Sequence, residues 1–156
     1  MHIHMKSSYK SKTIVCAIAL AVASLFLCSC EFETSDNGNL DGFWHLERID
    51  TLSTGGVCDT SSDLLFWSVQ MRLLNVSDKN NVHTNLNMHF EHSSATLRVY
   101  DAYLDGRMEG DPPLDDAALL RPYGINDLDE TFAVEQLTGS RMQLKGTTLR
   151  LTFRKF

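Results

Sequence analysis

The sequence predicts an all-β domain, an antiparallel up-and-down β-barrel of about eight strands with one short helix. Two features of the 156 residues carry this prediction. After residue 40, apolar and polar residues alternate in short segments that turn-forming residues separate. The chain is also small and acidic, so without disulfides it is expected to protect its strand edges by closing the sheet on itself. A two-sheet sandwich is the alternative that strand spacing leaves open.

The clearest strand covers residues 83–91. Leu86, Met88 and Phe90 fall on one face of it, while polar side chains occupy the other face. Such a strand is expected to cover a core with its apolar face. The same reasoning predicts strands at 41–49, 65–76, 83–91, 96–100, 131–137, 141–145 and 147–154.

Two segments do not follow the alternation. Residues 51–63 are rich in Ser, Thr, Gly and Asp and are expected to form a loop. Residues 101–124 contain several Gly and Pro turn signals. Within them, 114–120 is expected to form one or two helical turns that end at Pro122. Because function concentrates on loops carried by a rigid scaffold, these segments are expected to form the variable mouth of the barrel.

The first 29 residues have the pattern of a bacterial lipoprotein signal peptide. A lysine-bearing start precedes the apolar run 13–27, which is shorter than the roughly 20 residues of a membrane-spanning helix. The sequence Leu27-Cys28-Ser29-Cys30 then reads as a lipobox. We therefore expect residues 1–29 to be removed and Cys30 to carry a lipid.

The residues after this cysteine predict how the domain is attached. Residues 30–39 are polar and acidic and are expected to be a flexible tether before a domain that covers 40–156. The acidic residues behind Cys30 resemble the surface-export signal of Bacteroidota lipoproteins. The expected location is the outer membrane, with a lipid anchor and the domain facing either the periplasm or the cell surface.

The charge of the sequence argues against nucleic-acid binding, and its cysteines argue against a disulfide and a catalytic thiol. The formal net charge is −6, and every acidic residue follows Cys30, so the processed domain is a poor match for a nucleic acid. Cys58 is the one cysteine after the lipobox, which leaves no intrachain disulfide. Cys58 also has no neighbouring histidine in the sequence and is interpreted as an incidental thiol.

No metal or other cofactor is expected. His83, His89 and Glu91 share one strand face, but the two histidines lie roughly 20 Å apart along an extended strand and cannot bind one ion. The acidic residues between 101 and 116 are spaced too irregularly for a calcium loop, so an exposed acidic loop is the simpler interpretation.

Aromatic side chains are the candidates for ligand contacts. Trp67 follows the apolar alternation of its strand and is expected in the core. Tyr103 and Tyr123 flank the irregular segment, so they are the expected contacts at the rim of a ligand site.

The segment Gly42-Phe43-Trp44 at the start of the first strand resembles the lipocalin signature. In lipocalins that tryptophan closes one end of the barrel and an arginine packs over it; Arg150 and Arg154 both fit this role. The wider layout is similar to small lipocalin-like lipoproteins of Bacteroidota, whose function is unassigned. The matching pieces are the lipobox, Trp44, 66–70, 120–125 and 149–156. The resemblance implies a lipocalin-like β-barrel able to hold one small apolar ligand, and no enzyme activity.

The leading hypothesis is therefore a lipid-anchored, lipocalin-like binding protein of the cell envelope that holds a small apolar ligand. The alternative is a non-catalytic accessory subunit that docks a partner protein at the cell surface. A hydrolase that uses Asp115 or Asp116 is the least favoured hypothesis.

Overall fold

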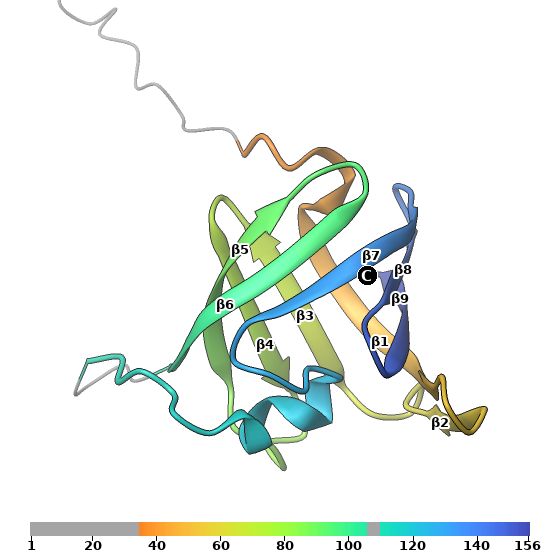
Figure 1. The fold of residues 1–156 in the computed structure, drawn as a ribbon. Helices are drawn as coiled ribbons and strands as arrows, with labels where there is room; N and C mark the ends of the chain where they lie inside the picture. Colours follow the sequence, from red (N-terminus) through yellow and green to blue (C-terminus); the bar gives the residue numbers. More distant parts are fainter. Residues whose placement is uncertain (1–34, 106–109) are drawn as a thin grey trace, which may run out of the picture. The chain divides into compact units, whose positions relative to one another are not determined.

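The computed structural model describes residues 35–105 and 110–156, which form nine strands and two short 3-10 helices (Figure 1). In chain order the elements are η1 (Gly38–Leu40), β1 (Gly42–Thr51), β2 (Gly56–Asp59), β3 (Leu65–Gln70), β4 (Leu73–Asp78), β5 (Leu86–His92), β6 (Thr96–Leu104), η2 (Ala117–Tyr123), β7 (Glu130–Leu137), β8 (Arg141–Lys145) and β9 (Leu149–Lys155). Among the described residues, no helix has the length and apolar character needed to cross a membrane.

The strands form a closed antiparallel barrel. Each strand from β3 to β8 pairs with the next one in the chain, and β1 pairs with both β3 and β9, which joins the two ends of the sheet. The short β2 is an extra strand that pairs with the last four residues of β1, beyond the segment of β1 that pairs with β3. The predicted barrel of about eight strands is confirmed, and the sandwich alternative is excluded.

Large side chains fill the barrel interior. Trp67, Phe132 and Phe153 are fully buried, and the Trp67 ring meets the other two rings edge-on at centroid distances of 6.0 and 5.1 Å. The apolar face of β5 is also buried, as its alternation predicts. Burial of these side chains is the main favourable term that holds the sheet closed.

Each end of the barrel is covered by a 3-10 helix. At one end, Leu40 of η1 is buried and its carbonyl oxygen accepts a hydrogen bond of 2.7 Å from Nε1 of Trp44. At the other end, Leu120 and Tyr123 of η2 are buried, and Nε1 of Trp67 donates to the Tyr123 carbonyl oxygen at 3.1 Å. In Figure 1, η2 and β2 lie toward the same end of the barrel.

Several element boundaries differ from the sequence-based expectation. The predicted strand 65–76 is two strands, β3 and β4, because Met71 adopts a positive φ of 55° and the chain reverses there. The predicted loop 51–63 contains β2. The helical turns lie at Ala117–Tyr123 rather than 114–120, with Asp116 as the N-cap and Pro122 inside the helix.

The predicted tether is partly fixed to the barrel. Residues 30–34 lie outside the described residues, but Ser35 and Asn37 both donate to a carboxylate oxygen of Asp41, at 2.7 and 2.8 Å. Asn37 Nδ2 also lies 2.7 Å from the carbonyl oxygen of Met71, in the turn between β3 and β4. These contacts hold Ser35 and Asn37 against the barrel, before the expected domain boundary at 40.

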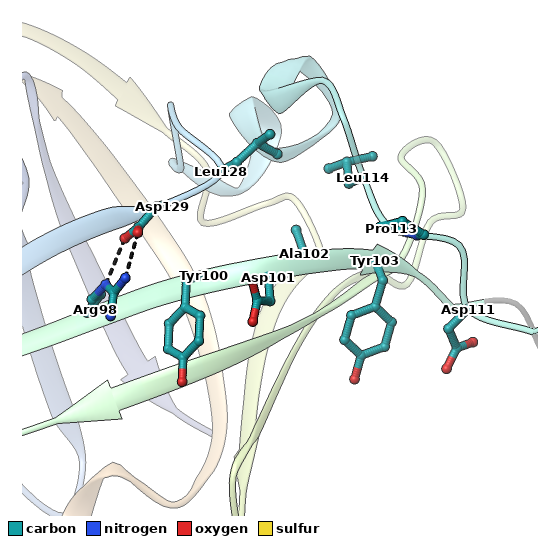
Figure 2. Close-up of a pocket in the computed structure, with 10 residues that line it drawn as sticks. All are labelled: Arg98, Tyr100, Asp101, Ala102, Tyr103, Asp111, Pro113, Leu114, Leu128 and Asp129. Atoms are coloured by element: carbon teal, nitrogen blue, oxygen red, sulfur yellow. Dashed lines mark hydrogen bonds and ion pairs between the residues drawn. The ribbon is translucent and has the colours of Figure 1, made fainter.

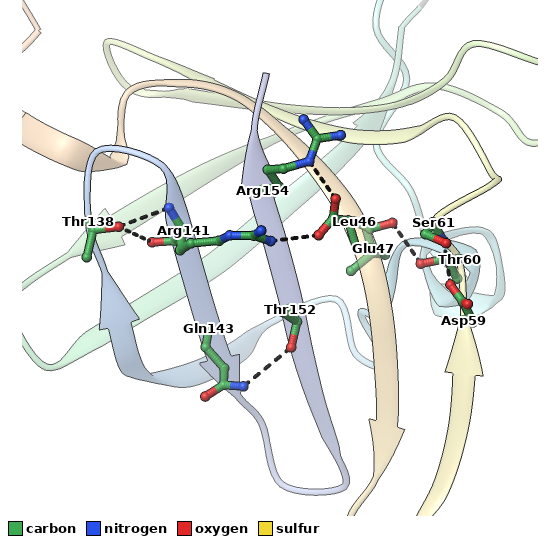
Figure 3. A network of polar contacts seen from close by, with 10 residues as sticks. All are labelled: Leu46, Glu47, Asp59, Thr60, Ser61, Thr138, Arg141, Gln143, Thr152 and Arg154. Carbon is green, nitrogen blue, oxygen red and sulfur yellow. Dashed lines mark hydrogen bonds and ion pairs between the residues drawn. The ribbon is translucent and has the colours of Figure 1, made fainter.

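Polar contacts reinforce the seam between β1 and β9 (Figure 3). The register shifts between Leu46 and Arg48, so Glu47 is the extra residue of a bulge in β1. Its carboxylate accepts from Nε of Arg154 at 2.6 Å and from Nη1 of Arg141 at 2.8 Å. One side chain thus links β1 to both β8 and β9.

Candidate functional site

A second bulge shapes the outer face of β6. His89 of β5 pairs with Tyr100 and Asn87 pairs with Tyr103, so a two-residue step in β5 faces a three-residue step in β6. Asp101 is in the left-handed region, with φ 50°, which non-glycine residues rarely occupy. The extra residue leaves both tyrosines on the outer face, while Ala102 is buried toward the core.

The neighbour of β6 changes along the same stretch. β7 pairs with β6 as far as Val99, opposite Glu130. Beyond the bulge, the neighbour is the segment that precedes η2: Leu104 N–H donates to the Pro112 carbonyl at 3.0 Å, and Leu114 N–H donates to the Ala102 carbonyl at 2.7 Å. The edge of β6 is therefore covered by two separate segments.

A pocket of about 590 Å³ lies where these two segments separate (Figure 2). Its apolar part includes Ala102, Leu114 and Leu128, the last two of which are partly buried and pack against the core. The complete lining is Arg98, Tyr100, Asp101, Ala102, Tyr103, Asp111, Pro113, Leu114, Leu128 and Asp129. An apolar surface with a few polar groups around it, at this volume, is typical of a small-molecule site.

One ion-pair cluster fixes the polar wall. Arg98 donates Nε and Nη2 to the two carboxylate oxygens of Asp129 at 2.8 and 2.6 Å, and Nη1 to Glu91 at 3.3 Å. Its guanidinium carbon lies 4.6 Å from the centroid of the Tyr100 ring. The hydrogen bonds from Arg98 lower the pKa of Asp129, and the two carboxylates raise the pKa of Arg98.

The other polar groups of the pocket are two carboxylates and two tyrosines. Asp101 is 72% exposed, and its Oδ2 lies 3.7 Å from Nδ1 of His89. The His89 ring is about equally far from the two tyrosines, with centroid distances of 6.0 Å to Tyr100 and 5.9 Å to Tyr103. Partial burial, together with the carboxylates of Asp111 and Asp105, raises the pKa of Tyr103.

The two tyrosines expected at the rim lie in different environments. Tyr103 lines the pocket. Tyr123 does not: it is fully buried, and its hydroxyl donates to the carbonyl oxygen of Thr84 at 2.9 Å. Burial, followed by the carboxylate of Asp78, raises the pKa of Tyr123. The expected rim contact at Tyr123 is therefore replaced by a core contact, because η2 turns this ring into the barrel end.

The expected barrel-closing tryptophan is buried, and the cation over it is a lysine. Nζ of Lys155 lies 4.8 Å from the Trp44 ring centroid. Gly42, at φ 128°, makes room for this contact, since a Cβ there would meet Lys155 Cε at 2.6 Å. Arg150 and Arg154 instead direct their guanidinium groups to Glu135 and Glu47.

The remaining candidates do not assemble into a site. Residues 35–105 and 110–156 contain no group of three metal-ligating side chains. Cys58 is exposed on β2. Cys30, the expected lipid attachment point, lies outside the described residues.

Sequence reasoning missed most of the pocket. It predicted a strand at 96–100 but gave no role to Arg98, Leu128 or Asp129. The pairing of Arg98 with Asp129 joins residues 31 positions apart, which alternation within one strand does not reveal. Both 51–63 and 101–124 were expected to form the mouth of the barrel, and the second of these segments, which includes Tyr103, contributes lining residues to the pocket.

Comparisons with known proteins agree with the fold. A family model for a lipocalin-like domain matches residues 25–156. The crystal structure of a lipocalin-like protein from Bacteroides uniformis ATCC 8492 is 21% identical, with a TM-score of 0.57, and the match covers 76% of this chain and 100% of that one. The crystal structure of an uncharacterized protein from Bacteroides eggerthii DSM 20697 is 16% identical, with a TM-score of 0.50. This match covers 74% of this chain and 98% of that one. No curated protein matches the sequence significantly.

Proposed function

Because the chain belongs to the lipocalin-like domain family, a fold with ligand-binding capacity, we propose that it is a lipid-anchored binding protein of the cell envelope. Its activity is non-catalytic. Its ligand is a small molecule with an apolar part, and the binding site is the pocket beside β6. Cys30 anchors the domain to the outer membrane through its lipid.

The pocket itself is the observation that supports this proposal. Its volume of about 590 Å³ falls within the roughly 300–1,000 Å³ typical of ligand sites. It lies on the flank of a barrel whose interior holds Trp67, Phe132 and Phe153. The packed interior favours the flank over the barrel axis as the place for a ligand.

A fragment screen by NMR tests the proposed site. We expect apolar fragments to shift the backbone amide signals of 98–103, Asp111, Leu114 and 128–129 in the processed chain carrying Cys30→Ser, which removes the lipid. The variant Leu128→Trp places a large ring in the pocket and is expected to weaken this binding by about tenfold or more. Leu119→Trp is the matched control, because Leu119 is exposed on η2 and does not line the pocket.

Shifts confined to the barrel end around η2, or the absence of any shifts across a chemically varied library, would contradict the pocket assignment. Equal weakening by Leu128→Trp and Leu119→Trp would do so as well, since only the first ring enters the pocket.

A second candidate is docking to a partner protein, favoured by an aromatic cluster on the outer wall. Phe43 and Phe66 stack at 4.3 Å, and Phe156 meets both edge-on while remaining 76% exposed. An exposed aromatic ring is a common anchor at protein interfaces. If the protein acts mainly by docking to a partner protein, Phe156→Ala reduces its crosslinking to that partner at the membrane. Fragment binding in the pocket beside β6 is then unchanged.

A further inference from the structure

The charge distribution of the pocket beside β6 indicates which kind of ligand it takes, given that the proposed function holds. Among the residues that the structure describes, three lining side chains are carboxylates, those of Asp101, Asp111 and Asp129, and one, that of Arg98, is cationic. Arg98 has two hydrogen bonds to Asp129 and a third to Glu91. Its positive charge is therefore already offset by two carboxylates, which makes it a poor receptor for an anionic ligand.

The aromatic side chains strengthen this negative character. The face of an aromatic ring attracts cations, and the guanidinium of Arg98 already lies 4.6 Å from the Tyr100 ring centroid. Like Tyr100, Tyr103 lies on the outer face of β6, and the carboxylates of Asp101 and Asp111 are near it (Figure 2). The raised pKa of Tyr103, caused by burial and then by Asp111 and Asp105, agrees with a local potential that disfavours negative charge.

The apolar part of the pocket sets a second requirement. Ala102, Leu114 and Leu128 offer no charged or hydrogen-bonding side-chain group to a ligand. An inorganic cation would leave this surface without a partner, whereas an organic cation with a hydrocarbon part would cover it.

We propose that the pocket beside β6 binds an organic cation, an ammonium group joined to an apolar body. The ammonium group lies against the Tyr103 ring and the Asp101 carboxylate, and the hydrocarbon part covers Ala102, Leu114 and Leu128. Asp101 contributes in two ways, because its backbone forms the bulge and its side chain supplies negative charge.

Three probes with one carbon skeleton test the charge preference. The processed chain carrying Cys30→Ser is titrated at pH 7 and low salt with 3-phenylpropylammonium, 3-phenylpropan-1-ol and 3-phenylpropanoate. The amide shifts of 98–103 report on binding. We expect the ammonium probe to bind about tenfold or more tightly than the alcohol, and the carboxylate probe to bind most weakly. Added salt is expected to reduce the differences in affinity among the three probes, because it screens the charges.

Two variants locate the preference. Asp101→Asn keeps a residue type that tolerates the left-handed backbone and removes the charge, so it is expected to reduce the ammonium-to-alcohol ratio by about threefold to tenfold. Asp63→Asn is the control, because it removes one negative charge at a residue that does not line the pocket. Tyr103→Leu keeps an apolar side chain without the ring and is expected to lower the same ratio.

Equal binding of the alcohol and ammonium probes in the pocket would overturn the cation preference and leave the proposed function intact. Tighter binding of the carboxylate probe than of the ammonium probe would also overturn the cation preference. A ratio that falls equally in Asp101→Asn and Asp63→Asn would show a general effect of protein charge and would also overturn it. Failure of every probe and of the wider fragment library would instead remove the proposed function.

Discussion

Asp78 is a buried carboxylate that organises the turn between β4 and β5. Its side-chain oxygens accept hydrogen bonds from the backbone N–H groups of Asn80 at 2.8 Å, Val82 at 2.9 Å and His83 at 3.0 Å. Burial by itself would raise the pKa of Asp78, but these backbone donors outweigh it and lower the pKa. Asp78 therefore stabilises the fold in its ionised form.

Replacing this carboxylate tests its role. Asp78→Ala leaves three backbone donors without their partner and is expected to lower the free energy of unfolding by about 2–4 kcal/mol at pH 7. Urea denaturation monitored by circular dichroism measures this change. Asp50→Ala, which removes a surface carboxylate paired with Arg48, is the control and should cost less than about 1 kcal/mol.

The pH dependence has a defined sign. Because the folded pKa of Asp78 is lowered, its contribution is complete above the unfolded pKa of about 3.9 and is lost as the pH falls through the folded value. The stability of Asp78→Asn should therefore decline less between neutral and acidic pH than that of the unchanged protein. Parallel declines would contradict this role.

Burial at the residue scale was predictable where a side chain follows the alternation of its own strand. Trp67 was expected in the core for this reason and is fully buried. Tyr123 has no strand of its own, and its burial depends on how η2 is placed by Gly124, at φ 81°, and by the hydrogen bond from Trp67. That placement is a long-range property that local sequence does not contain.

At the scale of elements, η2 acts as a plug for the barrel end. Tyr123→Phe removes the hydrogen bond to Thr84 and is expected to cost about 1 kcal/mol, whereas Tyr123→Ala also removes a buried ring and should cost about 3–5 kcal/mol. Leu119→Ala is the control, since this side chain is 41% exposed on the same helix. Urea denaturation that finds Tyr123→Ala as stable as Leu119→Ala would show that η2 is not part of the cooperative fold.

The bulge in β6 can be removed without changing which residues face the core. Leu97 and Val99 before Asp101, and Ala102 after it, are buried, so deletion of Asp101 restores a regular alternation. We expect the deletion variant to keep its circular dichroism spectrum and cooperative unfolding. Binding of 3-phenylpropylammonium should weaken by about tenfold or more, because the spacing of the tyrosines changes. Unchanged binding would show that the bulge does not shape the pocket.

Element existence was easier to predict than element boundaries. Segment 141–145 matches β8 because a regular alternation and clear turns define it. Segment 65–76 was expected as one strand, since its reversal at Met71-Arg72 contains no Gly or Pro to mark a turn. The 3-10 helix η2 accommodates Pro122, which sequence reasoning treated as a helix end.

At the scale of the whole molecule, Glu47 connects the first and last strands of the barrel. Burial by itself would raise the pKa of Glu47, but the interactions with Arg154 and Arg141 together outweigh it and lower the pKa. The ionised form therefore stabilises closure above the unfolded pKa. Glu47→Gln is expected to lower the free energy of unfolding by about 1–2 kcal/mol at pH 7, measured by urea denaturation. The loss should shrink as the pH falls through the folded pKa; a loss that is constant with pH would rule out this electrostatic role.

Attachment to the membrane is the other property of the whole molecule. Cys30→Ser is expected to release the protein from membranes while the barrel stays folded, because the strands of the described residues all follow residue 41. Fractionation after a high-salt wash, with immunoblotting, measures the distribution. Cys58→Ser is the matched control and should remain with the membrane. If the Cys30→Ser protein also remains there, the predicted lipid anchor is wrong.

The pairing of β1 with β9 also has a consequence for the time course of folding. Glu47 and Arg154 meet across this seam although they are 107 positions apart in the sequence. During synthesis, one edge of β1 has to wait for a partner that emerges only after most of the barrel has been made. Contacts of such long sequence separation slow folding, because the chain loses much entropy before they form. Until β9 has been made, β1 therefore keeps one edge without its partner strand.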